Sequence, residues 1–319
     1  MAWPMREPFA ISRGTQLEQP CIHVRLTDPD GFQGHGEGCG IIYDGETPET
    51  MLLDIDRVQR ELSQGFDRET LLTILPKGGA RCAVDAALWD LEAKRHGRSP
   101  YERALGRKGE AVDTAFTIGI RSIEAFEETA SAYADFALLK VKVGPGDPFE
   151  AISAVHRGAP DAKLIIDPNQ AWSADDVEAF ARRLLNLNVV LLEQPIPVGA
   201  EATLKERDIP ISLAADELIN EADDLEKAVG AFDVINIKLD KTGGLTNALK
   251  LADQAEAMGF GLMVGCMAGS SLSMAPAHVL AQRCAYVDLD GPLLQSQDYP
   301  DAMLYEAGRL HPATPALWG

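Results

Sequence analysis

The sequence has few basic residues for its length. Its 319 residues include 29 Lys and Arg against 49 Asp and Glu, a formal net charge of −20 at pH 7. Because like charges repel, this balance argues against nucleic acid or an anionic membrane surface as a partner. No stretch approaches the run of about 18 apolar residues that a membrane span needs. The opening MAWPMREPFA lacks the apolar core of a secretory signal. We therefore expect a cytoplasmic protein.

Cysteine is also scarce. The five cysteines are odd in number and show no CxxC spacing, which predicts reduced thiols in a cytosol and no zinc cluster. We expect Cys266 to lie near a site, and the other four to be small buried apolar side chains. The six histidines show no ligand spacing such as HExxH, which favours packing or surface positions.

The pattern of apolar and polar residues changes near residue 112. Before it, CIHVRLTDPDGFQGHGEG predicts two strands around a turn, and helical patterns follow at residues 48–62, 68–75 and 80–97. After it, apolar runs alternate with helical patterns at a repeat of about 25 residues, which indicates βαβ units and a parallel sheet. The expected strands are TAFTIGI, ALLKVKV, KLIID, VVLLE, ISLAAD, VINIKL, GLMVG and YVDLD.

Eight strands of this kind fit a TIM-type barrel. An open doubly wound sheet is the alternative. No GxGxxG or GxxxxGK[ST] motif follows the early strands, which weakens that alternative for nucleotide binding.

Three successive strands end in acidic residues, namely Asp167, Glu193 and Asp216. The carboxyl ends of barrel strands form one face, so we expect these side chains to lie side by side. Each acid alone could simply cap the helix that follows it. Three carboxylates at one mouth repel each other unless a cation lies among them, and oxygen ligands favour a hard ion such as Mg²⁺.

Lysines occupy the strands on either side of these acids. Lys140 and Lys142 lie two apart, so they point to the same face of their strand. Taken alone, they would suit an edge strand with a wet face. Lys238 and Lys241 come from a later strand across the mouth. Amines on both faces of a metal-bound substrate's α-carbon would suit racemisation or epimerisation, with the metal stabilising the enediolate. We expect Lys140 to lower the pKa of Lys142 by like-charge repulsion.

These residues resemble the enolase superfamily, muconate lactonizing enzyme subgroup. The motifs are KVK (140–142), IIDPN (165–169), LLEQP (191–195), AADE (214–217) and NIKLDKTGG (236–244), and the resemblance covers essentially the whole chain. It implies a (β/α)7β barrel over residues 111–291, closed by an α+β capping domain built from residues 1–110 and the tail 292–319. It also implies one Mg²⁺ on Asp167, Glu193 and Asp216, with Lys142 and Lys241 as acid/base residues.

Within the subgroup the chain is most similar to dipeptide epimerases of the L-Ala-D/L-Glu type. The resemblance implies that Asp288 and Asp290 of DLDGP bind the α-ammonium of the dipeptide. It also implies that Arg13, with Thr117, binds the glutamyl carboxylate. We place Lys140 among the substrate-binding residues and Asn169, Lys238 and Cys266 in supporting roles. Pro168 departs from the small residue more usual there, and we expect the metal site to persist.

Other functions remain open at this point. They include epimerisation of a different dipeptide, N-acylamino acid racemisation, o-succinylbenzoate formation, cycloisomerisation, and a ligand-binding barrel without catalysis. The DLDGP motif argues against the reactions whose substrates are not dipeptides. The intact lysines and carboxylates argue against a barrel without catalysis. The Ala-Glu resemblance implies a role in recycling cell-wall peptide. Assembly into a homo-oligomer is possible for a barrel of this family.

Overall fold

The computed structural model describes residues 1–12 and 14–319. Its centre is an eight-stranded parallel sheet in which each strand pairs with the next along the chain. The backbone N–H of Ala115 donates to the carbonyl of Val287 at 2.8 Å and joins the first strand to the last. The strands are β6 (Phe116–Ile118), β7 (Leu138–Lys142), β8 (Lys163–Asp167), β9 (Val189–Glu193), β10 (Ser212–Ala215), β11 (Val234–Lys238), β12 (Gly261–Gly265) and β13 (Tyr286–Val287).

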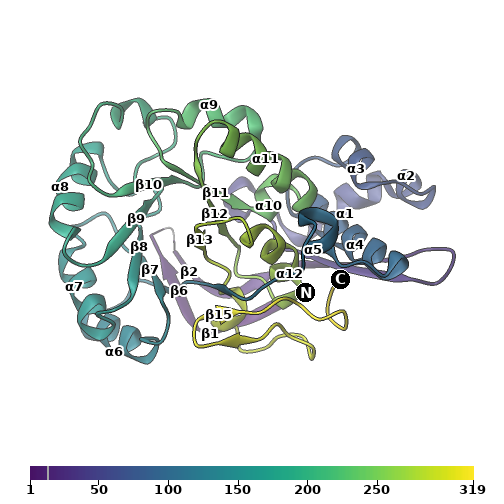
Figure 1. Cartoon of the computed structure of the whole chain (residues 1–319), viewed down its shortest axis with the longest axis horizontal. Helices are drawn as coiled ribbons and strands as arrows, with labels where there is room; N and C mark the ends of the chain where they lie inside the picture. Colours follow the sequence, from purple (N-terminus) through teal and green to yellow (C-terminus); the bar gives the residue numbers. More distant parts are fainter. Residues whose placement is uncertain (13) are drawn as a thin grey trace.

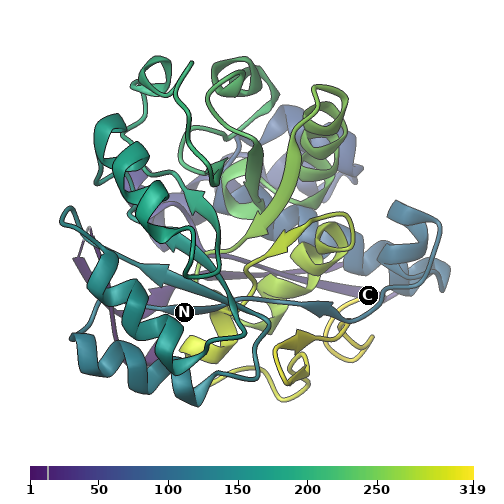
Figure 2. The same cartoon turned by 60° about the vertical axis from the view of Figure 1, so that its left-hand side comes forward.

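Helices cover the outside of these strands, as expected for βαβ units. In Figures 1 and 2, α6 to α8 line one side of the sheet and the cap helices α1 to α4 lie on the opposite side. A 3-10 turn, η2 (Glu201–Thr203), stands between β9 and β10 where other pairs have a helix. The helices are α6 (Ile123–Ala132), α7 (Phe149–Gly158), α8 (Ala174–Leu184), α9 (Leu225–Ala228), α10 (Leu239–Thr242), α11 (Leu245–Ala257) and α12 (Ser271–Ala281).

The cap begins with two hairpins. The predicted one is confirmed as β3 (Ile22–Thr27) and β4 (Gln33–Gly38), whereas β1 (Ala2–Ile11) and β2 (Gly14–Pro20) were not predicted. Alternate glycines in β4 let helix α4 pack directly on the strand, because a Cβ at Gly36 would lie 2.1 Å from a carbonyl oxygen of that helix. The predicted helix 48–62 is divided at Val58. The cap helices are α1 (Pro48–Arg57), α2 (Gln59–Ser63), α3 (Arg68–Ile74), α4 (Gly79–His96) and α5 (Pro100–Leu105), with a 3-10 turn η1 (Ile42–Asp44).

The C-terminal tail returns to the beginning of the chain. It contains α13 (Gly291–Leu294), β14 (Tyr305–Glu306) and β15 (Arg309–Leu310), and β15 pairs with β5 (Val112–Asp113). An isolated bridge joins Gln295 to Met5 of β1. The predicted fold class, an α/β TIM-like barrel with an α+β cap, is confirmed. In the described residues, no helix is long and apolar enough to cross a membrane.

Candidate active site

A polar layer lies above an apolar layer inside the barrel. Alternate side chains of a strand point to the same face, and one cluster collects the lower inward positions, Ala115, Leu138, Ile165, Leu191, Ala214, Val234 and Met263. Two residues further along, toward the carboxyl ends, the inward positions are polar: Lys140, Asp167, Glu193, Asp216 and Asn236. The edge-strand explanation for the lysine pair is therefore wrong, because β7 lies between β6 and β8 and all five of its residues are buried.

Lys140 is surrounded by carboxylates. Its side chain is 2% exposed, and its Nζ lies 2.7 Å from Glu193 Oε2, 2.8 Å from Asp288 Oδ2 and 3.3 Å from Asp167 Oδ2. Burial opposes its charge, but these acids outweigh burial and raise the pKa of Lys140 well above its usual value. The expected effect of Lys140 on Lys142 stays a prediction.

The other three lysines pair with the two outer acids of the trio. Lys142 donates to Asp167, its partner in the sheet register. Lys238 and Lys241 lie 2.7 Å from Asp216 Oδ2 and Oδ1, respectively. Because β7 and β11 flank the three strands that carry the acids, the structure places Lys142 and Lys241 at opposite ends of the row of carboxylates.

The three acids differ in their ionisation. Burial alone would raise the pKa of Asp167, but Lys142 and Lys140 lower it to about 2. Lys238 and Lys241 outweigh burial in the same way and hold the pKa of Asp216 well below its usual range. Burial raises the pKa of Glu193 to about 7, aided by repulsion from Asp167 and Asp216. Glu193, the middle acid of the three, is therefore the one whose negative charge is least favourable in this site.

The donor chemistry of this row suits a hard divalent cation. All the candidate ligands are carboxylate oxygens, and one further buried oxygen beside them, Asn169 Oδ1, accepts no hydrogen bond. As the side chains stand, no three His, Cys, Asp or Glu side chains in residues 1–12 and 14–319 gather closely enough to hold a metal ion. In this arrangement the ammonium groups of Lys140 and Lys238 pair with two of these carboxylates, Glu193 and Asp216.

Asp288 and Asp290 lie beside the first barrel strand, with 4% and 3% of their surfaces exposed. Thr117 connects them: its N–H donates to Asp290 Oδ2 at 2.5 Å, and its hydroxyl donates to Asp288 Oδ1 at 3.2 Å. Burial and the nearby Asp288 raise the pKa of Asp290 to about 7. The hydroxyl of Thr117 is thus engaged with the aspartates, and its predicted contact with a glutamyl carboxylate stays a prediction.

A cavity of about 480 Å³ opens between the barrel mouth and the cap. Lys142, Asn169, Lys238 and Cys266 line it from the barrel side. From the cap it is lined by Phe9, Ile11, Gly14, Thr15, Gln16, Gln19, Gly40, Ile42 and Tyr43. Arg13, the predicted ligand of the glutamyl carboxylate, lies outside the described residues.

Some residues at the site were not predicted. The Nδ2 of Asn236 donates to Glu193 Oε1 at 3.0 Å, and the Oε1 of Gln194 accepts from the N–H of Asp216 at 2.9 Å. Asn236 lies two residues before Lys238, so strand alternation would have placed it on the inward face. Tyr43 of η1 was not singled out from the sequence, because its place at the cavity depends on how the cap closes.

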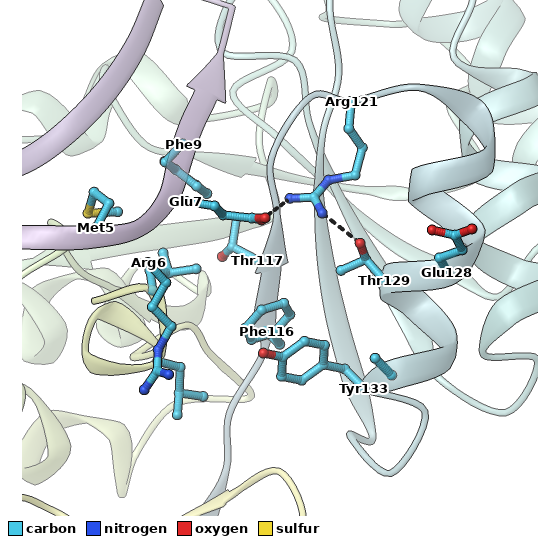
Figure 3. A pocket seen from close by; sticks show the side chains of 13 residues that line it. Met5, Arg6, Glu7, Phe9, Phe116, Thr117, Arg121, Glu128, Thr129 and Tyr133 are labelled. Atoms are coloured by element: carbon cyan, nitrogen blue, oxygen red, sulfur yellow. Dashed lines mark hydrogen bonds and ion pairs between the residues drawn. The ribbon is translucent and has the colours of Figure 1, made fainter. Parts of the chain in front are cut away.

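A second pocket, of about 360 Å³, lies outside the barrel beside β6. Figure 3 shows Arg121 between Glu7 of the cap hairpin and Thr129 of α6, with the aromatic rings of Phe116 and Tyr133 below them. Arg121 pairs with Glu7 at 2.8 Å and donates to Thr129. Of the predicted site residues, Thr117 is the one that lines this pocket, so we assign the chemistry to the cavity at the barrel mouth.

Comparison with known proteins agrees with this geometry. Residues 1–102 match the mandelate racemase / muconate lactonizing enzyme N-terminal domain, and residues 124–315 match the enolase C-terminal domain-like family. The chain belongs to this family of the enolase superfamily, with its barrel, its cap and its row of strand-end acids.

Its relatives are isomerases. The chain is 38% identical over 312 residues to the L-Ala-D/L-Glu epimerase of Escherichia coli (strain K12), which covers 97% of each chain. It is 42% identical over 260 residues to an N-acetyl-D-glutamate racemase of Pseudoalteromonas sp, which covers 82% of each chain.

Two solved structures are similar over nearly the whole chain. An enolase family member from Agrobacterium tumefaciens, with bound sodium and L-Ala-L-Glu, has a TM-score of 0.97 at 39% identity and covers 100% of this chain and 98% of its own. A dipeptide epimerase from Methylococcus capsulatus with Mg and L-Arg-D-Lys has a TM-score of 0.91 at 31% identity, covering 98% and 95%.

Proposed function

We propose that the protein is a Mg²⁺-dependent dipeptide epimerase that acts on L-Ala-D/L-Glu by moving a proton at the α-carbon of the C-terminal residue. One observation carries the proposal: the two candidate bases lie at opposite ends of the row of acids, Lys142 on β7 beside Asp167 and Lys241 on α10, which follows β11, beside Asp216. A substrate centred on the acids would have one amine at each side of its α-carbon.

Each residue has a distinct part in this proposal. Asp167, Glu193 and Asp216 would hold Mg²⁺, which when bound supplies Lewis-acid stabilisation for negative charge on the substrate carboxylate. The neutral Nζ of one lysine takes the α-proton, and the ammonium of the other returns a proton to the opposite face. The reverse reaction exchanges the two roles.

Asp288 and Asp290 would bind the α-ammonium of the dipeptide. Both are buried beside Thr117, and two carboxylates so close together favour a cation between them. We further propose that Arg13 binds the glutamyl carboxylate, because a planar guanidinium matches a carboxylate in two hydrogen bonds. The cap residues around it, Gly14 and Thr15, line the cavity.

A second candidate is racemisation of an N-acylated glutamate. The 42% identity to an N-acetyl-D-glutamate racemase favours it, and so does the local chemistry. Lys140 pairs with Asp288 at 2.8 Å, and a pKa of about 7 lets a proton neutralise Asp290. The aspartates therefore do not require a substrate ammonium. Both candidates share the glutamate at the reacting end and differ at its amino group.

The test compares the two substrates directly. L-Ala-L-Glu and N-acetyl-L-Glu are incubated separately with the protein and Mg²⁺, and chiral chromatography follows the opposite epimer. A charge-assisted contact to the ammonium would favour the dipeptide by about 10- to 100-fold in kcat/KM. A preference for the N-acetyl compound would establish the second candidate, and turnover of neither compound would overturn both.

The biological setting is also a proposal. Reduced cysteines and a strongly acidic composition support a cytoplasmic enzyme, and the epimerase assignment supports a role in recycling cell-wall peptide. We propose that residues 1–110 with 292–319 form the capping domain and residues 111–291 the catalytic barrel. Homo-oligomer formation is consistent with this architecture and can be measured by sedimentation.

A further inference from the structure

The turn that carries Lys241 is a single helical turn. All four residues of α10 are buried, and Lys241 itself is fully buried with its Nζ against Asp216. One turn of helix makes too few hydrogen bonds to hold its own shape. The position of Lys241 therefore depends on what surrounds α10.

Arg81, on α4 of the cap, holds the end of this turn. Its Nη2 donates to the carbonyl of Thr242 at 2.8 Å, and its Nε donates to the carbonyl of Gly243 at 3.1 Å. Its Nη1 donates to the carbonyls of Leu75 and Leu72 at the end of α3. The residue is 7% exposed. A planar guanidinium with all three nitrogens engaged has one orientation, so it fixes the turn relative to the cap.

Asp85, one helical turn further along α4, holds the next segment. It is fully buried, and its carboxylate accepts from the N–H of Thr246 at 3.1 Å and from the Thr246 hydroxyl at 2.5 Å. Thr246 is the second residue of α11, so the cap supplies the carboxylate that caps this barrel helix. The Nε1 of Trp89 also donates to the Thr246 hydroxyl, at 3.0 Å.

The two glycines after Lys241 make these contacts possible. A Cβ at Gly243 would lie 2.4 Å from the Nε of Arg81, and one at Gly244 would lie 2.5 Å from the Cβ of Asp85. Both glycines also have positive φ values, 72° and 114°, which other residues rarely adopt. The two glycines of the DKTGG segment are therefore explained by the close approach of α4.

We propose that Arg81 is a positioning residue that holds Lys241 in place for proton transfer. The inference rests on the proposed function, in which Lys241 serves one face of the α-carbon and Lys142 serves the other. Lys142 lies on β7 and takes no part in the contacts of Arg81. Loss of Arg81 therefore impairs proton transfer at one face and spares the other, which a general loss of stability would not do.

The experiment measures solvent deuterium incorporation at the α-carbon of L-Ala-L-Glu and of L-Ala-D-Glu by NMR, with Mg²⁺ in D₂O. The variants Lys142→Ala and Lys241→Ala first establish which epimer depends on which lysine. In Arg81→Met we expect incorporation into the Lys241-dependent epimer to fall by about 10- to 100-fold, while the other epimer keeps its rate. Arg81→Lys should fall between Arg81→Met and the wild type.

Arg103→Met is the matched control, because it makes the same substitution in the cap and removes a part-buried ion pair to Glu92. It should change both epimers equally or not at all. Equal losses for the two epimers in Arg81→Met, or no loss, would overturn the positioning role.

A second measurement needs no turnover. Crystal structures of wild type and Arg81→Met, grown under the same conditions, report the separation of Lys241 Nζ from Asp216 Oδ1, which is 2.7 Å here. A longer separation in the variant supports the proposal, and an unchanged one overturns it. If the wild type exchanges neither epimer, the proposed function fails, and the crystal structures still decide the positioning role.

Discussion

Replacing Lys140 by Met should produce the largest loss of stability of any single change at the site. The Lys140 ammonium lies 2.7 to 3.3 Å from three buried carboxylates. At an effective dielectric constant of about 20, each contact contributes about 5–6 kcal/mol before the cost of desolvation is subtracted. Removing one partner of a buried ion pair leaves a net loss of about 3–5 kcal/mol. We expect a loss of this size for Lys140→Met, because Met keeps the aliphatic stem and removes only the charge.

Urea denaturation at pH 7.5 measures this loss, first in EDTA and then in Mg²⁺. Magnesium should stabilise Lys140→Met more than it stabilises the wild type, because the variant lacks the ammonium that competes for the same acids. A cation at about 100 times its Kd contributes about 2.7 kcal/mol. Lys250→Met is the control, since it removes an exposed pair with Glu69. Equal stability of the two variants in EDTA would refute the reasoning.

Three further changes test other parts of the account. Burial lowers the pKa of His278 to about 4, so the unfolded chain binds the proton first as the pH falls below 6.5, and up to about 3 kcal/mol of folding stability is lost toward pH 4. In urea titrations, the free energy of unfolding of His278→Asn should depend less on pH than that of the wild type. An unchanged pH dependence would contradict the burial argument. In kinetic assays, Asp290→Asn should reduce kcat/KM for L-Ala-L-Glu by about 10- to 100-fold and should reduce kcat/KM for N-acetyl-L-Glu much less. Equal losses for the two substrates would show that Asp290 does not bind the substrate ammonium. Glu7→Gln breaks the ion pair with Arg121, in which the Glu7 side chain is 64% exposed. The free energy of unfolding of this variant should therefore change by less than about 1 kcal/mol, with kcat unchanged. A larger loss of stability would show that this ion pair anchors the hairpin.

The alternation of a strand was enough to predict much of the site. Lys140 and Lys142 share one face of β7, and two neighbouring strands end in inward acids, Asp167 and Glu193. A parallel barrel brings strand ends together, so sequence position alone placed these side chains in one mouth. The structure does bring them together.

The pairing between these side chains could not be predicted. Lys140 meets Asp288 across 148 residues of sequence, and that contact depends on the closure of the barrel. Pairings of this kind follow from three-dimensional distance, which a local pattern does not contain.

Two of the elements that were not predicted have local explanations. Helix α12 contains Pro276, and all of its residues are buried, so it shows no polar stripe of helical period. Strand β1 contains Pro4 and Pro8, which weaken a strand prediction, but it lies in a two-stranded sheet with β2, where such residues are tolerated.

The central claim is that two lysines act on opposite faces of one α-carbon. The most direct measurement follows α-deuterium incorporation into L-Ala-L-Glu and L-Ala-D-Glu in Lys142→Ala and in Lys241→Ala, with Mg²⁺ in D₂O. The account predicts that neither variant interconverts the epimers, and that each still exchanges one of them, a different one in each variant. Exchange of the same epimer by both variants, or epimerisation at the wild-type rate by either, would contradict it.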